Sequence, residues 1–285
     1  MASTTTPEQH ISSMTDRYAV VGNPIAHSKS PLIHTEFARA TVQDLGYEAL
    51  LAPLDGFKAA VEAFRAAGGK GANVTVPFKQ EAFALCSELS PRARAAGAVN
   101  TLSFGPDGIH GDNTDGAGLV ADIRQNLGVP MAAKRILLLG AGGAARGVIL
   151  PLLAEKPASL TLANRTPAKA VELAARFSGD SMGITGCGFA DLAGKRFDVV
   201  INATAASLSD EAPALPEGLF APDSLAYDMV YGKGLTPFLQ AALQQGAARL
   251  ADGLGMLVEQ AAAAFQIWRG VRPDTTAVFD LLRAL

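Results

Sequence analysis

Polar side chains that could bind or react with a small molecule gather in the first half of the chain. They stand in four short segments, at residues 28–31, 73–79, 98–101 and 111–116. Several of these segments follow predicted strands directly, and ligands of α/β proteins bind beyond the carboxyl ends of parallel strands. Their hydroxyl, amide, amino and carboxylate groups suit a small polyhydroxylated substrate that bears a carboxylate.

A glycine-rich turn stands between an apolar run and a helical pattern. The run 136–139 is typical of a buried strand, and the turn after it fits the pattern G-x-G-x-x-A. In that pattern the first glycine permits a tight turn, the second lets the backbone approach a pyrophosphate, and a small last residue allows close helix packing. The helix N-terminus then offers N–H groups to phosphates. This context favours a dinucleotide site over an ordinary glycine-rich turn that binds no ligand, and over a membrane span at 136–154. The turn consists of Gly140, Ala141, Gly142, Gly143, Ala144 and Ala145.

The end of the next predicted strand indicates which dinucleotide binds. An NAD-binding unit places an Asp or Glu there, against the ribose hydroxyls, but this chain has Asn164, Arg165 and Thr166. A guanidinium pairs well with a 2′-phosphate, and Asn and Thr can hydrogen-bond to one. Lys169 could add charge, while Thr166 before Pro167 could also cap the helix. The sequence therefore predicts NADP(H) as the cofactor.

One lysine and one aspartate could supply the chemistry that such a cofactor needs. Hydride transfer to a ketone builds negative charge on its oxygen, which must be stabilised and protonated. Lys79 and Asp115 could do both, since a nearby carboxylate fixes the position of an ammonium group. Lys79 follows Pro77 and should lie in the first turn of a helix, where a cation costs a few tenths of a kcal/mol to about 1 kcal/mol. That cost favours a catalytic role for Lys79 over a structural one.

The elements that must position these groups alternate between strand and helix, which predicts an α/β fold with mostly parallel strands. A first series ends in a hairpin, a helix at 117–127 and the breaker 128–130, and a second series follows. The first has strands 18–22, 47–52 and 72–76, helices 31–44, 56–67 and 78–87, and the hairpin 98–104 and 109–113; the second has strands 135–139, 159–163, 198–202, 226–230 and 249–251 and helices 144–154, 167–177, 237–245, 254–268 and 275–283.

Composition excludes several other classes of protein. The chain has 285 residues, which suggests two domains. Hydrophobic residues make up 49% of the chain, which is enough to form hydrophobic cores. A net charge of −3 argues against a nucleic-acid binder. Cys86 and Cys187 lie far apart and the histidines are dispersed, so no disulfide framework or metal site is expected and a reducing, cytoplasmic setting fits best. Residues 1–15 lack the features of a signal peptide and are expected to be a disordered tail. The chain is expected to be a soluble protein without a membrane segment.

Seven segments together resemble the shikimate dehydrogenase family. They are VGNPIAHSKSP at 21–31, NVTVPFK at 73–79, GAVNT at 97–101, GDNTDG at 111–116, GAGGAA at 140–145, NRT at 164–166 and GMLVEQA at 255–261. The resemblance implies reversible, NADPH-dependent reduction of 3-dehydroshikimate to shikimate in aromatic amino-acid biosynthesis. With the two series of elements it implies a substrate domain of residues 16–115 plus 254–285 and a Rossmann-type, doubly wound NADP-binding domain of residues 116–253. The C-terminal helices would return to the first domain, and the protein would be a monomer or homodimer.

The resemblance also implies roles for individual residues. Ser28 and Ser30 would hold the substrate carboxylate, although Ser30 before Pro31 could instead be a helix N-cap. Met256 and Gln260 are four residues apart and share a helix face, with Met256 near the nicotinamide and Gln260 reaching the substrate. The substrate set is then Ser28, Ser30, Asn73, Thr75, Lys79, Asn100, Asp115, Tyr231 and Gln260, and the cofactor set adds Met229, Gly253 and Met256 to the glycine-rich turn, residues 164–166 and Lys169.

Two alternatives remain open. The first is a quinate/shikimate dehydrogenase with relaxed substrate or cofactor use. Such relatives tend to have Thr where Ser30 stands, and NAD users tend to have Asp near Asn164; neither is present. The second is a catalytically silent NADPH-binding regulator. It would need no pair such as Lys79 and Asp115, and the sequence has no evident basic segment for reading DNA.

Overall fold

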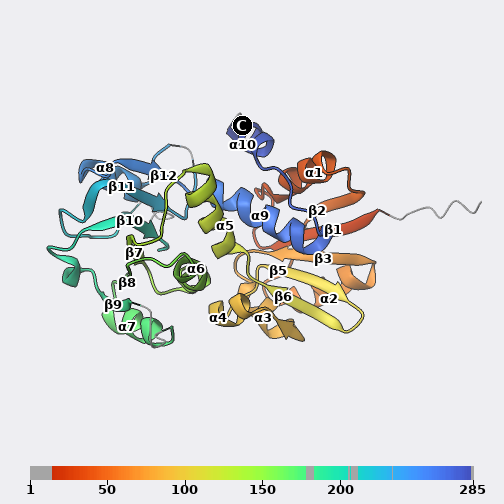
Figure 1. Cartoon of the computed structure of the whole chain (residues 1–285). Coiled ribbons are helices and arrows are strands. Elements are labelled where there is room, and N and C mark those ends of the chain that lie inside the picture. The colour runs from red at the N-terminus through yellow and green to blue at the C-terminus, as the bar shows by residue number, and fades with distance from the viewer. Residues whose placement is uncertain (1–14, 178–182, 205, 207–210, 233, 284–285) are drawn as a thin grey trace, which may run out of the picture.

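The chain forms two six-stranded sheets, which lie on either side of the central helices α5 (Asp115–Ala121) and α9 (Leu254–Arg269) (Figure 1). This computed structural model describes residues 15–177, 183–204, 206, 211–232 and 234–283. Apart from Thr15, the tail expected at residues 1–15 lies outside the described residues. Two α/β sheets of this kind confirm the predicted fold class.

The first sheet is built from the N-terminal series of elements. Strand β1 pairs in parallel with β2 and β3, while β5 is antiparallel to both β3 and β6. Because β1 and β3 are parallel neighbours, the polar segments that follow them emerge at the same edge of the sheet. The order is β2-β1-β3-β5-β6-β4. The elements are β1 (Asp16–Gly22), β2 (Leu45–Leu51), β3 (Gly69–Val74), β4 (Glu88–Leu89), β5 (Thr101–Gly105), β6 (Gly108–Asp112), α1 (Ser30–Ala40), α2 (Phe57–Ala66), α3 (Lys79–Leu85) and α4 (Pro91–Ala96).

The second sheet is parallel throughout its described pairings. Its order, β12-β11-β10-β7-β8-β9, is that of a Rossmann dinucleotide-binding fold, in which ligands bind where the order reverses, between β7 and β10. The apolar run Ile136–Leu139 is fully buried in β7, as predicted for a buried strand. The elements are β7 (Arg135–Leu139), β8 (Ser159–Asn164), β9 (Ile184–Gly188), β10 (Phe197–Asn202), β11 (Phe220–Asp228), β12 (Arg249–Ala251), α6 (Gly143–Ala154), α7 (Pro167–Ala175), η2 (Ala190–Leu192) and α8 (Pro237–Gln244).

The end of the chain returns to the first sheet. Val258 and Phe265 of α9 and Val278 of α10 (Thr276–Arg283) are buried in one apolar cluster with Ile33 and Phe37 of α1. Burial of such side chains stabilises the folded state by about 1.5–3 kcal/mol each, so this cluster holds α9 firmly against α1. The predicted return of the C-terminal helices is confirmed.

Several predicted boundaries are wrong, for local physical reasons. The helix expected at 31–44 ends at Ala40, because Val42 adopts a left-handed φ of 53°. The helix expected at 117–127 begins at Asp115 and continues from Asp122 to Asn126 as the π-helix η1. The strand expected at 226–230 spans Phe220–Asp228, because Pro222 interrupts its apolar pattern. Strands β4 and β9, helix α4 and the turn η2 were not predicted; β9 carries two glycines in Ile184–Gly188, which weaken a strand pattern.

Helices α5 and α9 approach so closely that only glycine fits at one point of contact. A Cβ at Gly118 would lie 2.6 Å from the backbone nitrogen of Gln260 and 2.7 Å from the backbone oxygen of Met256. Both neighbours belong to the backbone of α9, so they cannot move aside without displacing the helix. Gly118, three residues after Asp115, therefore sets the spacing between two helices that carry predicted site residues.

We expect Gly118→Ala to lower the free energy of unfolding by about 1–3 kcal/mol, through overpacking of this contact. Gly147→Ala in α6 is the matched control, because its Cβ would meet the side chain of Asn113 only at 3.5 Å. Alanine favours a helix over glycine by up to about 1 kcal/mol, so this control should be neutral or stabilising. Urea unfolding of both variants measures the difference; equal stability would contradict the packing argument.

Candidate active site

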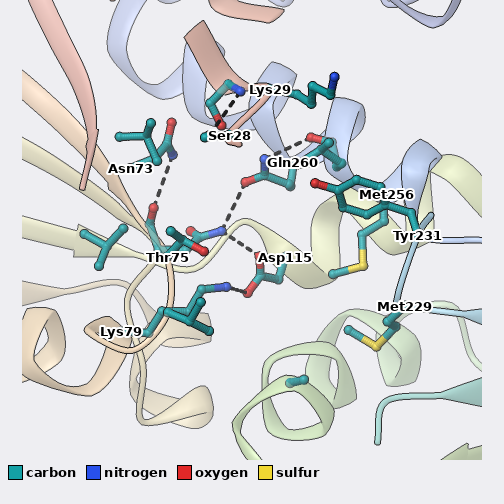
Figure 2. A pocket seen from close by; sticks show the side chains of 18 of the residues that line it. Ser28, Lys29, Asn73, Thr75, Lys79, Asp115, Met229, Tyr231, Met256 and Gln260 are labelled. Atoms are coloured by element: carbon teal, nitrogen blue, oxygen red, sulfur yellow. Dashed lines mark hydrogen bonds and ion pairs between the residues drawn. The ribbon is translucent and has the colours of Figure 1, made fainter. Parts of the chain in front are cut away.

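A cavity of about 530 Å³ lies between the two sheets, at the carboxyl ends of their strands. Side chains reach it from both sheets and from α9 (Figure 2). All the residues that the sequence predicted for the substrate line it, together with part of the predicted cofactor set. Those lining residues are Ser28, Ser30, Asn73, Thr75, Lys79, Asn100, Asp115, Tyr231 and Gln260, with Ala144, Met229, Gly253 and Met256 from the cofactor set.

Lys79 and Asp115 form an ion pair in this cavity. Nζ of Lys79 donates to Oδ2 of Asp115 at 2.6 Å (Figure 2), and the side chains are 31% and 14% exposed. Lys79 is the first residue of α3, as predicted, and Asp115 is the first residue of α5. The ammonium group is thus held at the cavity wall by a partly buried carboxylate and still reaches solvent or a ligand. Such a pair can donate a proton to an oxygen atom and stabilise negative charge on it.

Asn100 is held in one orientation by neighbours on three sides. Its Oδ1 accepts from the backbone N–H of Thr114 and from the Thr101 hydroxyl, each at 2.8 Å. Its Nδ2 therefore points to Asp115 Oδ1 at 2.8 Å and to Gln260 Oε1 at 3.3 Å. Sequence reasoning missed Thr101 and Thr114 as supporting residues, although both stand in segments that it singled out. This network joins β5, α5 and α9 around the ion pair.

Tyr47 positions Asn73, and no motif in the sequence pointed to it. Its hydroxyl donates to Asn73 Oδ1 at 2.7 Å, while Asn73 Nδ2 donates to the backbone oxygen of Asn100 at 3.2 Å. The Tyr47 ring stacks on His34 at 4.2 Å between centroids. Burial lowers the pKa of His34 to about 3, so this side chain stays neutral at physiological pH. The Tyr47 contact depends on the pairing of β2 and β3 with β1, which sequence spacing does not reveal.

The N-terminus of α1 borders the cavity at Ser28, Lys29 and Ser30. The helix begins at Ser30 with Lys29 in the cap position, and the backbone N–H of Ser30 donates to Ser28 Oγ at 3.3 Å. The alternative that Ser30 is the N-cap is therefore wrong. No acidic side chain lies in the first turn, so the partial positive charge of the helix end is available to an anion. Two hydroxyls at a helix N-terminus suit a carboxylate.

The glycine-rich turn has the shape that a dinucleotide pyrophosphate requires. Gly140 has a φ of 111°, which favours glycine, and a Cβ at Gly142 would meet nothing within 4 Å. Ala145 is fully buried against the sheet, as predicted for the small residue of the pattern. No side chain caps α6 and its first turn has no acidic residue, so its N-terminal N–H groups can bind phosphate. The residues present therefore fit the cofactor.

The predicted 2′-phosphate residues lie outside the cavity, at the end of β8. Asn164 Nδ2 donates to the backbone oxygen of Thr166 at 3.0 Å, which shapes the turn into α7. Arg165 and Lys169 are exposed, and neither forms an ion pair within the part of the chain that the structure describes. Thr166 occupies the cap position of α7 before Pro167, but its side chain makes no capping hydrogen bond. Thr166 is thus at the predicted N-cap position, but the expectation that its side chain caps the helix is wrong.

Neither a metal centre nor a membrane-spanning helix is found among the described residues. No group of three or more His, Cys, Asp or Glu side chains there could hold a metal ion. None of the helices in that part of the chain is long and apolar enough to cross a membrane. The apolar run at 136–154 is instead the strand β7, the glycine-rich turn and helix α6.

Comparisons with known proteins agree with this geometry. Residues 20–102 match the model of the shikimate dehydrogenase substrate binding domain, residues 122–209 that of shikimate / quinate 5-dehydrogenase, and residues 253–282 that of the shikimate 5'-dehydrogenase C-terminal domain. A relative from Aromatoleum aromaticum named shikimate dehydrogenase (NADP(+)) is 68% identical over 94% of this chain and 97% of its own.

Solved structures give the same result. An Ael1 enzyme from Pseudomonas putida is 53% identical, with a TM-score of 0.89 over 94% of this chain and 98% of its own. A shikimate 5-dehydrogenase from Thermus thermophilus, in complex with NADP(H) and shikimate, is 33% identical, with a TM-score of 0.82 over 94% of this chain and 99% of its own. With its two sheets, its cavity and these matches over nearly its whole length, the chain belongs to the shikimate dehydrogenase family.

Proposed function

We propose that the cavity binds shikimate or 3-dehydroshikimate beside NADP(H), and that Lys79 and Asp115 handle the proton. The chain catalyses the reversible, NADPH-dependent reduction of 3-dehydroshikimate to shikimate in aromatic amino-acid biosynthesis. The observation that carries the assignment of roles is the Lys79–Asp115 ion pair of 2.6 Å, which lies in a cavity shared by both sheets. The relative from Thermus thermophilus, whose structure holds NADP(H) and shikimate, supports the same pair of ligands here.

Lys79 is the proton donor of the reduction in this proposal. NADPH supplies a hydride to the ketone carbon, and the ketone oxygen gains negative charge as the carbonyl bond is reduced. The Lys79 ammonium stabilises that charge and transfers one proton to the oxygen, which gives the hydroxyl. Asp115 keeps Lys79 in place, and in the reverse direction the neutral amine accepts the hydroxyl proton. Asn100 and Gln260 border the same pair and orient the ring of the substrate.

The cofactor residues divide among three parts of the dinucleotide: the pyrophosphate, the 2′-phosphate and the nicotinamide. The glycine-rich turn and the N-terminus of α6 hold the pyrophosphate, and Arg165, with Asn164, Thr166 and Lys169, holds the 2′-phosphate. Met229, Gly253 and Met256 meet at the cavity, where a Cβ at Gly253 would lie 2.2 Å from the backbone oxygen of Met229. This close contact shapes the wall against which the nicotinamide packs.

One assay tests the function directly. Purified protein is mixed with shikimate and NADP, and the absorbance of NADPH is followed, beside reactions with quinate and with NAD. Fast turnover with shikimate and NADP alone is expected. Comparable turnover with quinate or NAD would favour the relaxed-specificity alternative, and no turnover with any pair would favour a silent NADPH-binding regulator.

Ser28→Ala and Ser30→Ala are expected to weaken substrate binding and leave NADP binding unchanged. Each hydroxyl lost to a charged carboxylate should raise KM for shikimate by about tenfold to a hundredfold, from contacts of about 1.5–3 kcal/mol. Steady-state kinetics with both substrates varied measures the two KM values separately. A Ser30→Ala variant that lost only thermal stability would argue against this role.

The domain boundaries, oligomeric state and location stay predictions. Packing of α9 and α10 against α1 supports the substrate domain of residues 16–115 plus 254–285, with residues 116–253 as the NADP-binding domain. The protein is expected to be a monomer or a homodimer, and size-exclusion chromatography with light scattering distinguishes the two. Cys86 and Cys187 are free thiols, which supports a reducing cytoplasm; cell fractionation tests it.

A further inference from the structure

Tyr227 is a buried tyrosine of β11 whose hydroxyl joins three elements, yet it does not line the active-site cavity. The hydroxyl donates to Oδ2 of Asp122 in η1 at 2.7 Å and accepts the backbone N–H of Met256 in α9 at 3.2 Å. Tyr227 is 0% exposed and Asp122 4% exposed. Buried polar groups of this kind are costly unless they are satisfied, so the contacts bind the three elements together.

The contact with Met256 completes the N-terminus of α9. Met256 is the third residue of the helix, where a backbone N–H has no partner within the helix. The cap residue is Gly253, which has no side chain to offer, so the Tyr227 hydroxyl takes this place from another element. Asp252 Oδ1 accepts the N–H of Leu254 at 3.2 Å in the same way. The beginning of α9 is thus located by side chains, and Met256 lies at its first turn.

Asp122 can reach this point only because residue 255 is a glycine. A Cβ at Gly255 would lie 2.1 Å from the carboxyl group of Asp122. Asn126 Nδ2 donates to Asp122 Oδ1 at 2.9 Å and to Glu259 Oε1 at 3.2 Å, while Glu259 is paired with Arg272. Burial, with the charges of Glu259 and Asp252, raises the pKa of Asp122. Burial, with the Asp122 charge, holds the pKa of Tyr227 well above 10, so its hydroxyl keeps its proton and donates it.

Each of the three joined elements carries cavity residues or is directly continuous with a segment that does. The helix α5 begins at Asp115 and continues into η1 at Asp122; β11 leads to Met229 and Tyr231; and α9 carries Met256 and Gln260 (Figure 2). A displacement at the Tyr227 hydroxyl would therefore move the nicotinamide wall relative to the Lys79–Asp115 pair. The contacts that would anchor the ligands, at Arg165 and at the two serines, lie elsewhere.

We propose that Tyr227 and Asp122 are positioning residues, which hold α9 so that Met256 and Gln260 keep cofactor and substrate at reacting distance. The proposal rests on the proposed function, because it concerns the same hydride transfer. Small misplacements of reacting groups cost up to about a hundredfold in rate. Loss of the hydroxyl should therefore lower kcat while the binding of either ligand, which depends on other contacts, changes little.

Tyr227→Phe is the direct test, with Tyr18→Phe as the matched control. Tyr18 is also a buried tyrosine, on β1, and does not line the cavity. We expect Tyr227→Phe to lower kcat about tenfold or more, with both KM values within about twofold of the wild type. With shikimate deuterated at the carbon that loses hydride, the kinetic isotope effect should rise, because hydride transfer becomes more rate-limiting. Tyr18→Phe should keep wild-type kcat even if its Tm falls.

Asp122→Asn provides a second variant in case Tyr227→Phe folds poorly. An asparagine can still accept the hydrogen bond of the Tyr227 hydroxyl through Oδ1. The decrease in kcat of Asp122→Asn should therefore be several times smaller than that of Tyr227→Phe or Asp122→Leu. Wild-type kcat with an unchanged isotope effect in Tyr227→Phe, or in Asp122→Leu, measured well below Tm, would overturn the positioning role alone. An inactive wild-type protein in the same assay would overturn the proposed function, and this proposal with it.

Discussion

Lys79→Ala is expected to lower kcat by about a hundredfold to ten-thousandfold, the usual effect of losing an acid–base group, with smaller changes in both KM values. The variant keeps the fold of the cavity, because Asp115 retains its bond from Asn100 at 2.8 Å and its backbone N–H still donates to Asn113. What it loses is the ammonium group 2.6 Å from Asp115, which is the proposed source of the proton for the substrate oxygen. Turnover of shikimate with saturating NADP measures the effect.

Lys70→Ala is the matched control for Lys79→Ala. Lys70 is an exposed lysine of β3, in the first sheet and outside the cavity, so its removal should leave kcat unchanged. Asp115→Asn should also lower kcat. If the two residues act as a unit, the double variant should lose much less than the product of the two single losses. Near-normal turnover in Lys79→Ala would remove the assignment of the proton donor and leave the cofactor site intact.

Arg165→Ala is expected to raise KM for NADP by about tenfold to a hundredfold and to leave KM for shikimate nearly unchanged. The lost contact is a charge-assisted hydrogen bond to the 2′-phosphate, which contributes about 1.5–3 kcal/mol. Arg165 is exposed at the end of β8, so its removal should cost little stability. Arg165→Asp should go further and narrow the preference for NADP over NAD, because a carboxylate repels the phosphate and can bond ribose hydroxyls.

Arg196→Ala serves as the control for both Arg165 variants. Arg196 is exposed and directly precedes β10. It therefore lies at the amino ends of the parallel strands, whereas the glycine-rich turn lies at their carboxyl ends, so NADP binding should not change. Steady-state kinetics at saturating shikimate, with NADP and with NAD, gives kcat and KM for each of the two cofactors. An Arg165→Ala variant with wild-type KM for NADP would show that the 2′-phosphate is held by other groups.

The sequence by itself determined the class of the fold and the polar residues of the proposed substrate site, all of which line the cavity. Strand, turn and helix at 135–154 could be predicted because the apolar run, the glycines and the helix start are local signals read within one segment. The same holds for Lys79 at the beginning of α3 and for the polar segments after β1 and β3. Strand β9 escaped prediction and β11 was predicted only at its C-terminal end, because two glycines in β9 and Pro222 in β11 break the apolar pattern.

Only the tertiary structure decided which side chains orient the site residues. Tyr47 of β2 reaches Asn73 of β3 because both strands pair with β1, one on each side of it. The backbone N–H of Thr114, which follows β6, holds Asn100 because β5 and β6 are paired. Tyr227, Asp122 and Met256 stand far apart in the sequence and meet only because α5–η1, β11 and α9 converge there. Such contacts join residues of high sequence separation through buried hydrogen bonds, which have no local pattern, so the sequence names the reacting groups and the packing of distant elements sets their geometry.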